Sequence, residues 1–233
     1  MKLVFLLEEP SVQCVLDVLL PQILPEGVTY LTIPHNGKKA LERSLGHKLR
    51  AWNEPDDVRF VVLEDQDTKD CIELKAHLNA LCAESGKPYL IRIACQEMEA
   101  WYFGDPEAVV AAYPNSKFDQ WARKKQYRNP DRIPSPKEAL RRLIPEHQQI
   151  NGAKRIAKHM QIERNTSRSF QVFVEGVRRL ASPRRKHLVR CRKELPASFV
   201  KRLKAEGAYY GFRKTDSRAS KKDTQCGEQE TRI

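Results

Sequence analysis

Val58-Arg-Phe-Val-Val-Leu-Glu-Asp-Gln-Asp67 is the stretch that decides the fold of this chain. It opens with an apolar run rich in β-branched residues, typical of a strand in a parallel sheet that is covered on both faces. The run ends in three acids, Glu64, Asp65 and Asp67. Ligands of open α/β sheets bind beyond the carboxyl ends of the strands, so Asp-x-Asp at this point suggests a site for a hard cation such as Mg²⁺. In extended chain Asp65 and Asp67 would point the same way.

Strand and helix signals alternate around this stretch. The predicted strands are 2–7, 28–33, 58–63 and 89–94, and the helices between them cover 12–20, a short segment ending near 52, and 70–83. This order predicts an α/β fold, a mainly parallel sheet with helices on both faces. We expect Ser11 to be the N-cap of the first helix, and Pro21 and Pro25 to end it.

The pattern changes after Cys95 to helices and loops. The predicted helices are 97–103, 105–112, 135–144, 152–160 and 167–180. We therefore expect three parts: an α/β core over 1–104, a helical cap packed on it over 105–182, and a basic tail over 183–233. Apolar residues thin out in the tail, which predicts disorder there.

The net charge of +12 is unevenly distributed. Residues 183–233 hold 15 Lys+Arg against 6 Asp+Glu, whereas the preceding 182 residues hold 27 against 24. A basic tail can attract phosphate backbones through a salt-sensitive interaction, which favours DNA or RNA as a partner. The alternative is a solvated tail that only keeps the protein soluble.

The composition also restricts the compartment. No apolar run approaches the ~20 residues that span a bilayer, so we expect no membrane association. Acids at Glu8 and Glu9 interrupt the apolar start, which favours a first strand over a signal peptide. The six cysteines are scattered without a Cys-x-x-Cys pair, which fits buried thiols in a reducing cytoplasm better than a zinc site or a disulfide frame.

Acids follow two further strands of the predicted sheet. Glu8 and Glu9 end the first strand, and Glu97 and Glu99 follow the fourth. Neighbouring strands lie about 4.8 Å apart, so acids from different strands can share one cation. Mg²⁺ or Mn²⁺ needs only one or two carboxylates besides water and phosphate. We predict a metal site made by Glu8, Asp65, Asp67 and Glu99; the alternative is that these acids are ordinary loop residues.

A resemblance rests on five pieces that recur in order. They are Phe5-Leu-Leu-Glu-Glu-Pro-Ser11, Val62-Leu-Glu-Asp-Gln-Asp67, Cys95-Gln-Glu-Met-Glu-Ala-Trp101, Ile133-Pro-Ser-Pro-Lys-Glu-Ala-Leu140 and Arg168-Ser-Phe-Gln-Val-Phe173. A first strand ending in Glu and a later one ending in Asp-x-Asp resemble the Toprim domain of topoisomerases, primases and nucleases of the overcoming-lysogenization-defect (OLD) type. In detail the chain resembles a small Toprim-related bacterial family of unknown function, kin to the RloB-like and OLD-type groups.

The resemblance implies roles for individual residues. Glu8 would be general acid/base or metal ligand, Asp65 and Asp67 metal ligands, and Glu99 a further ligand. It implies a Mg²⁺-dependent nuclease that cleaves phosphodiesters as an effector beside a separate ABC-type ATPase in phage defence. The chain itself has no Walker motif. Glu9 stands where the Toprim strand usually has Gly, which favours the rival hypothesis of a catalytically inactive binding or adaptor subunit.

Other functions fit the sequence less well. A haloacid-dehalogenase-like phosphatase carries Asp-x-Asp-x-Thr/Val on its first strand, whereas here the motif is on the third and Lys69 follows it. A receiver-like domain with Asp65 as phosphoacceptor stays as a minor alternative. Basic residues of the helical part could bind a nucleic-acid backbone, and the alternative for each is a solvated helix face: Lys154, Arg155, Lys158 and Arg168.

Overall fold

The computed structural model describes residues 1–54 and 57–182. The basic tail, whose disorder we predict, lies outside the described residues. The elements in chain order are β1 (Lys2–Leu7), α1 (Pro10–Ile23), β2 (Thr29–Pro34), α2 (Lys38–Ala51), β3 (Val58–Asp65), α3 (Cys71–Ala83), β4 (Tyr89–Ala94), α4 (Ala100–Gly104), α5 (Pro106–Ala112), α6 (Phe118–Ala122), the 3₁₀ helices η1 (Lys125–Tyr127) and η2 (Pro130–Arg132), α7 (Pro136–Leu143), α8 (Gln149–Ala157) and α9 (Arg168–Ala181).

The described strands form one sheet in the order β2-β1-β3-β4, and every neighbouring pair is parallel. The α/β fold predicted from the sequence is thereby confirmed. β1 and β3 are the two central strands, and Leu7 of β1 is in register with Leu63 of β3. Asp65 is in register with Ala94 of β4. The segments that follow β1, β3 and β4 therefore leave the sheet along the same edge.

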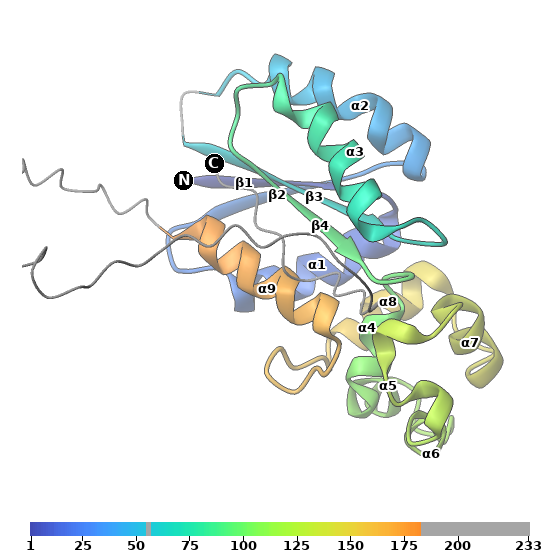
Figure 1. Cartoon of the computed structure of the whole chain (residues 1–233). Helices are drawn as coiled ribbons and strands as arrows, with labels where there is room; N and C mark the ends of the chain where they lie inside the picture. Colours follow the sequence, from blue (N-terminus) through green and yellow to red (C-terminus); the bar gives the residue numbers. More distant parts are fainter. Residues whose placement is uncertain (55–56, 183–233) are drawn as a thin grey trace, which may run out of the picture. The chain divides into compact units, whose positions relative to one another are not determined.

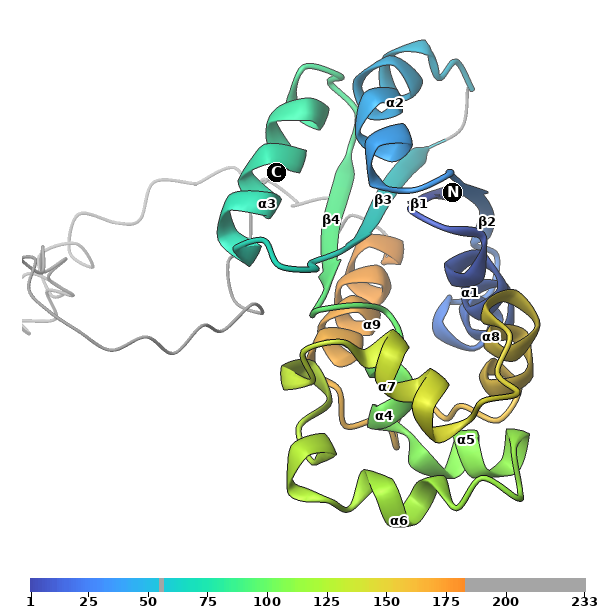
Figure 2. The same cartoon turned by 90° about the vertical axis from the view of Figure 1, so that its right-hand side faces the viewer.

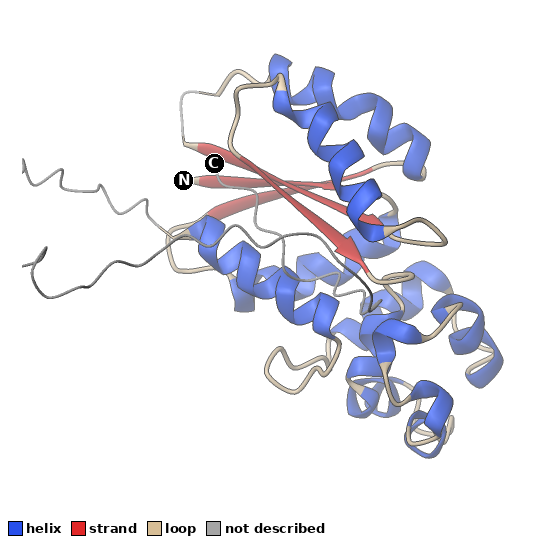
Figure 3. Ribbon diagram, viewed as in Figure 1, coloured by secondary structure: helices blue, strands red, loops and turns tan. Residues whose placement is uncertain are grey.

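Helices cover both faces of the sheet, as expected from its apolar strands (Figures 1 and 3). One face packs on α2 and α3 through the even-numbered side chains of the central strands, Val4, Leu6, Phe60 and Val62. The opposite face uses the odd-numbered side chains, Leu3, Phe5, Leu7, Val61 and Leu63, and packs on α1 and α9. The pleat of β3 thus decides to which face of the sheet the side chain of each acid at its end points.

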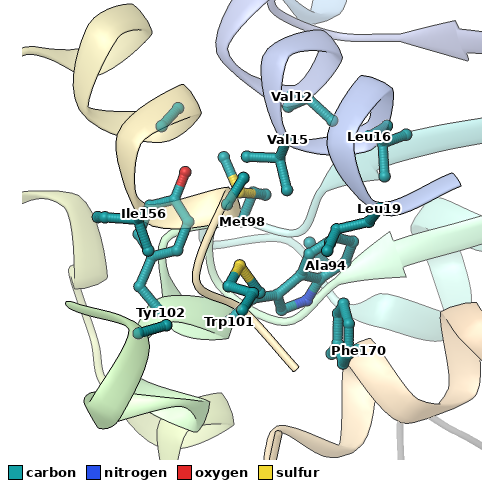
Figure 4. Packing of buried hydrophobic residues seen from close by; sticks show 14 of the residues in the cluster. Val12, Val15, Leu16, Leu19, Ala94, Met98, Trp101, Tyr102, Ile156 and Phe170 are labelled. Carbon is teal, nitrogen blue, oxygen red and sulfur yellow. The ribbon is translucent and has the colours of Figure 1, made fainter. Parts of the chain in front are cut away.

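The helical half shares the core of the second face. The indole of Trp101 and the ring of Tyr102 are buried among α1 residues such as Val12 and Val15 and among Ile156 of α8 (Figure 4). The indole N–H of Trp101 donates to Ser169 Oγ of α9 at 3.0 Å. These buried aromatic rings give the short helices after β4 an apolar core, and α4 to α8 gather beyond the carboxyl ends of the strands (Figure 2).

Two acids, the buried Asp105 and the half-buried Asp131, join segments of the helical half. Asp105 accepts from the backbone N–H of Ala108 and Gln161 and from the guanidinium of Arg164. Asp131 accepts from the hydroxyls of Ser167 and Ser169 at the start of α9. Buried carboxylates need such donors to offset lost hydration. Both side chains therefore hold loops that carry few apolar residues.

Several helix boundaries differ from the sequence predictions. Glu9, not Ser11, is the N-cap of α1, and the helix runs two residues past Pro21. A proline near a helix end sacrifices one backbone hydrogen bond, and the N–H of Leu24 still reaches Leu20 O at 2.9 Å. The predicted helix 97–103 begins only at Ala100, and α8 begins at Gln149, three residues before the predicted start. The short α6 was not predicted.

The cysteines and helices of the described residues bear on two further predictions, buried thiols and the absence of a membrane span. Cys14, Cys82 and Cys95 carry free thiols, and the last two are buried. Among the described helices, none combines the length and the apolar character needed to cross a bilayer.

Candidate functional site

Glu8 and Asp65 meet at the carboxyl ends of the two central strands. Glu8 is the first residue after β1, and its Oε2 accepts a hydrogen bond from the backbone N–H of Asp65 at 3.0 Å. The Glu8 carbonyl accepts from the N–H of Gly37 at 3.0 Å. Burial raises the pKa of Glu8, against the opposing effect of the hydrogen bond from Asp65. The juxtaposition predicted from the order of strands is present.

Asp65 is the last residue of β3, and its carboxyl group is buried on the face of the sheet that packs on α1. Its Oδ1 accepts from the backbone N–H of Met98 at 3.0 Å, which fixes the side chain against the segment after β4. Burial raises the pKa of Asp65 well above its usual range, and the charges of Glu99 and Glu8 raise it further. A group of this kind gains most from a nearby cation.

Glu99 lies beside Asp65 at the start of α4 and is 4% exposed. Burial raises its pKa to about 7, and the charge of Lys137 opposes this rise. No ion pair within 4.0 Å involves Glu8, Asp65 or Glu99 among the described residues. Three buried carboxyl groups thus lie near one another without a directly bound cation.

Asp67 departs from the prediction that it points the same way as Asp65. β3 ends at Asp65, and Asp67 adopts a left-handed backbone with φ 52°. Its N–H donates to Gln96 O at 2.7 Å, which turns the chain toward the end of β4. The prediction assumed extended chain and is wrong in this respect. The Asp67 carboxylate is half exposed and pairs with Lys38 at 2.7 Å.

Lys38 is a member of the site that the sequence did not single out. It is the first residue of α2, and it follows Gly37, whose φ of 86° is a conformation that glycine adopts without strain. Its Nζ donates to the backbone carbonyl of Asp65 at 2.8 Å as well as to Asp67. Burial lowers the pKa of Lys38, but the hydrogen bond to Asp67 and the charges of Glu8, Asp67 and Glu64 outweigh it, so the pKa is raised.

Glu64 lies on the opposite face of the sheet from Asp65, as the pleat requires. It is 1% exposed, and neither carboxylate oxygen has a hydrogen-bond partner within the described part of the chain. The nearest cation is Lys38, whose Nζ is 3.7 Å from Glu64 Oε1. Burial raises the pKa of Glu64 to about 8, against the opposing charge of Lys38.

Lys137 neutralises the outer acids of the site. Its Nζ lies 3.4 Å from Glu9 Oε2, and its backbone N–H donates to Glu97 Oε2 at 2.8 Å. The sequence places Lys137 at the start of a predicted helix without indicating these partners. The signal that could have identified it is its position directly after Ser-Pro at the first turn, where a backbone N–H is free for an acid.

Glu9 faces a hollow of about 370 Å³ beside the acids. Gln149 of α8 donates to its Oε2, and the hydroxyl of Ser11 donates to the same atom at 3.3 Å. The backbone of Glu9 is extended, with φ −134° and ψ 155°, so this conformation does not require the Gly expected from the resemblance. The hollow is lined by Glu9, Pro10, Ser11, His35, Asn36, Gly37, Gln149 and Ile150.

The predicted nucleic-acid-binding residues lie on two elements. Lys154, Arg155 and Lys158 are exposed at the C-terminal end of α8, whereas Gln149 at its first residue touches Glu9. The guanidinium of Arg155 lies over the ring of Tyr113. Arg168 begins α9 and pairs with Glu175 at 3.6 Å. The α8 residues remain open to solvent.

The donor chemistry of Glu8, Asp65 and Glu99 fits a hard divalent ion. Within residues 1–54 and 57–182 no three His, Cys, Asp or Glu side chains form a ready-made metal-binding group. Mg²⁺ usually keeps several waters, however, and is held by one or two carboxylates together with substrate phosphates. The charges of Glu8 and Glu99 raise the pKa of Asp65, so a cation beside these three carboxyl groups would relieve that repulsion.

Comparison with known proteins gives one family. No curated protein and no solved structure matches the sequence significantly. The sequence profile of a family described as a domain of unknown function, DUF4276, matches residues 7–178, and this range includes Glu8, Asp65, Asp67 and Glu99. The expectation of a family of unknown function is thus confirmed at this level. The chain belongs to the DUF4276 family.

Proposed function

We propose that the chain is a Mg²⁺-dependent, Toprim-like nuclease that cleaves phosphodiesters and works with a separate ABC-type ATPase in phage defence. The observation that carries the proposal is the contact between Glu8 and Asp65 at the ends of adjacent parallel strands. The relation to Toprim nucleases of the RloB-like and OLD types rests on the sequence pieces, and so does the ATPase partner.

In this proposal each residue of the site has a separate role. Glu8, Asp65 and Glu99 would hold Mg²⁺ or Mn²⁺, with Asp67 at the open side of the site. A bound divalent ion supplies Lewis-acid polarisation of the phosphate and lowers the pKa of water. Burial raises the pKa of Glu8, which is the direction that favours a carboxyl group as general acid or base. The basic residues at the end of α8 would contact backbone phosphates.

The test is a cleavage assay on plasmid DNA, single-stranded DNA and RNA with Mg²⁺ and Mn²⁺, alone and with an ABC-type ATPase of the proposed kind. We expect wild-type cleavage to fall at least a hundredfold in Asp65→Asn, because the amide keeps the shape of the side chain but loses its charge. Asp119→Asn is the matched control, since Asp119 lies on α6 and forms only a long ion pair with Arg123.

The rival proposal is an inactive binding or adaptor subunit with the same fold. The pairing of Asp67 with Lys38 and of Glu9 with Lys137 favours it, because these lysines already neutralise two acids at the edge of the sheet. Tight binding to the ATPase without cleavage of any substrate, by wild type and Asp65→Asn alike, would support this alternative and contradict the nuclease.

A further inference from the structure

The Lys38 ammonium is surrounded by oxygens at the edge of the sheet. It lies 2.8 Å from the carbonyl of Asp65, 2.7 Å from Asp67 Oδ2 and 3.7 Å from Glu64 Oε1. Its side chain is only 15% exposed. Two carboxylates and a backbone carbonyl are the donor set that proteins offer to hard cations. A charged nitrogen occupies the centre of that set.

The backbone fixes Lys38 in this place. Gly37, the residue before it, donates its N–H to the carbonyl of Glu8, so the start of α2 is joined to the end of β1. The residue two positions earlier, His35, donates its N–H to Leu7 O at 2.9 Å. These two bonds hold Lys38 at the end of β1, near the charge of Glu8, and from there its Nζ reaches the carbonyl of Asp65 at the end of β3. It is not a flexible surface lysine that happens to meet an acid.

Glu64 gives an independent indication of a cation position. A fully buried carboxylate without hydrogen-bond donors is costly unless a cation lies beside it. Lys38 is the cation within 4 Å of Glu64 in the described part of the chain, and at 3.7 Å it makes no hydrogen bond to it. The oxygens of Glu64 are thus directed at a place that the ammonium only partly satisfies.

The pleat separates this place from the other acids. Glu64 and Asp65 are consecutive residues of β3, so their side chains point to opposite faces of the sheet, and Glu99 acts by its charge on Asp65. The backbone carbonyl of Asp65 and the charge of Glu8 connect the two. The edge of the sheet therefore offers two neighbouring cation positions, and Lys38 fills one of them.

We propose that the Lys38 ammonium is a built-in cation that takes the second of these positions, so that each chain binds one divalent ion, through Glu8, Asp65 and Glu99, and not two. This inference rests on the proposed function, since it presumes that the acids bind a metal. In this inference the protein itself supplies a fixed positive charge, the Lys38 ammonium, beside the place that a substrate phosphate would take.

The experiment counts bound Mn²⁺ on the full-length protein, from the electron paramagnetic resonance signal of the free ion during titration. We expect one ion per wild-type chain and two per chain in Lys38→Met, which keeps the length of the side chain but removes its charge. Adding Glu64→Gln to Lys38→Met should return the count to one. Lys39→Met, an exposed neighbour, is the matched control and should bind one.

Each outcome is decisive. Two ions on wild type, or one ion on a folded Lys38→Met, would overturn the inference while leaving the proposed function intact. No binding by wild type would contradict the metal site itself, and the inference with it. If Lys38→Met fails to fold, as judged by circular dichroism, Lys38→Gln, which also removes the charge, takes its place and should bind two ions, whereas one ion on this variant would overturn the inference.

Discussion

The carboxylate of Glu8 accepts a hydrogen bond of 3.0 Å from the backbone N–H of Asp65, although the two residues are 57 positions apart in the sequence. This bond joins the ends of the two central strands and brings one acid over the other. Burial of the two carboxyl groups raises the pKa of each, although the hydrogen bond itself lowers the pKa of Glu8. The cost of that burial leads to measurable predictions.

The stability of the metal-free protein should fall as pH rises from about 4.5 to 8. Burial raises the pKa of Glu64 to about 8 and of Glu99 to about 7, so the folded chain binds more protons than the unfolded chain in this range. Stability therefore decreases with pH across this window and is greatest below it. At about 1.4 kcal/mol per pKa unit, Glu64 alone accounts for a loss on the order of a few kcal/mol.

Urea denaturation in the presence of a chelator, at several pH values, measures this effect. Glu64→Gln should flatten the decline, because an amide does not ionise, and Glu26→Gln at an exposed position should leave it unchanged. A stability that rises between pH 5 and 8 in the wild type would contradict the prediction.

Arg164→Ala should lower the free energy of unfolding by about 3 kcal/mol, because it leaves the fully buried Asp105 carboxylate without its cation. Arg178→Ala is the control: Arg178 pairs with Glu163 at 3.2 Å, but both side chains are largely exposed. Its expected effect is within about 0.5 kcal/mol. Equal losses in the two variants, measured by chemical denaturation, would refute the argument.

Glu9→Gly should strengthen the binding of a short single-stranded oligonucleotide by a few fold at low salt, on the order of 1 kcal/mol. The substitution removes the carboxylate that pairs with Lys137 and leaves this lysine available for phosphate. Glu9→Gln separates charge from bulk, because it removes only the charge. Fluorescence anisotropy that detects no change in either variant would show that Glu9 does not restrain binding.

Charge in the tail should set the salt dependence of nucleic-acid binding. Changing Arg184, Arg185 and Lys186 to Gln should make the slope of log K against log salt less negative by up to about 3, if each contacts a phosphate. Charge-preserving exchanges at the same positions, Arg184→Lys, Arg185→Lys and Lys186→Arg, should keep the wild-type slope. Identical slopes in both sets would leave the tail without a role in binding.

Much of the fold could be predicted from local pattern. The apolar run before Glu64 indicated a buried strand, and the alternation of strands and helices up to Ala94 indicated a parallel sheet, which the structure confirms. Helix boundaries were less accurate. α8 starts at Gln149, whose side chain donates to Glu9, a partner 140 positions away that no local signal reveals.

Part of the candidate site could also be predicted from the sequence, and part could not. Strand order and the acids at strand ends were sufficient to expect Glu8 near Asp65. These signals could not predict the orientation of Asp67, because it depends on a left-handed backbone and a hydrogen bond to Gln96. The role of Lys38 could not be predicted either, since a lysine after glycine carries no signal of its partners.

The sequence by itself determined the sheet, because period-two and continuous apolar runs have few ways to bury their surface, and it determined which residue types stand at the ends of the strands. Only the tertiary structure decided which of these charges meet. Electrostatic pairing acts over a few ångströms between residues far apart in the chain, so the neighbours of Glu64, Asp67 and Lys38 follow from the packing of α2 against β3 and not from any local pattern.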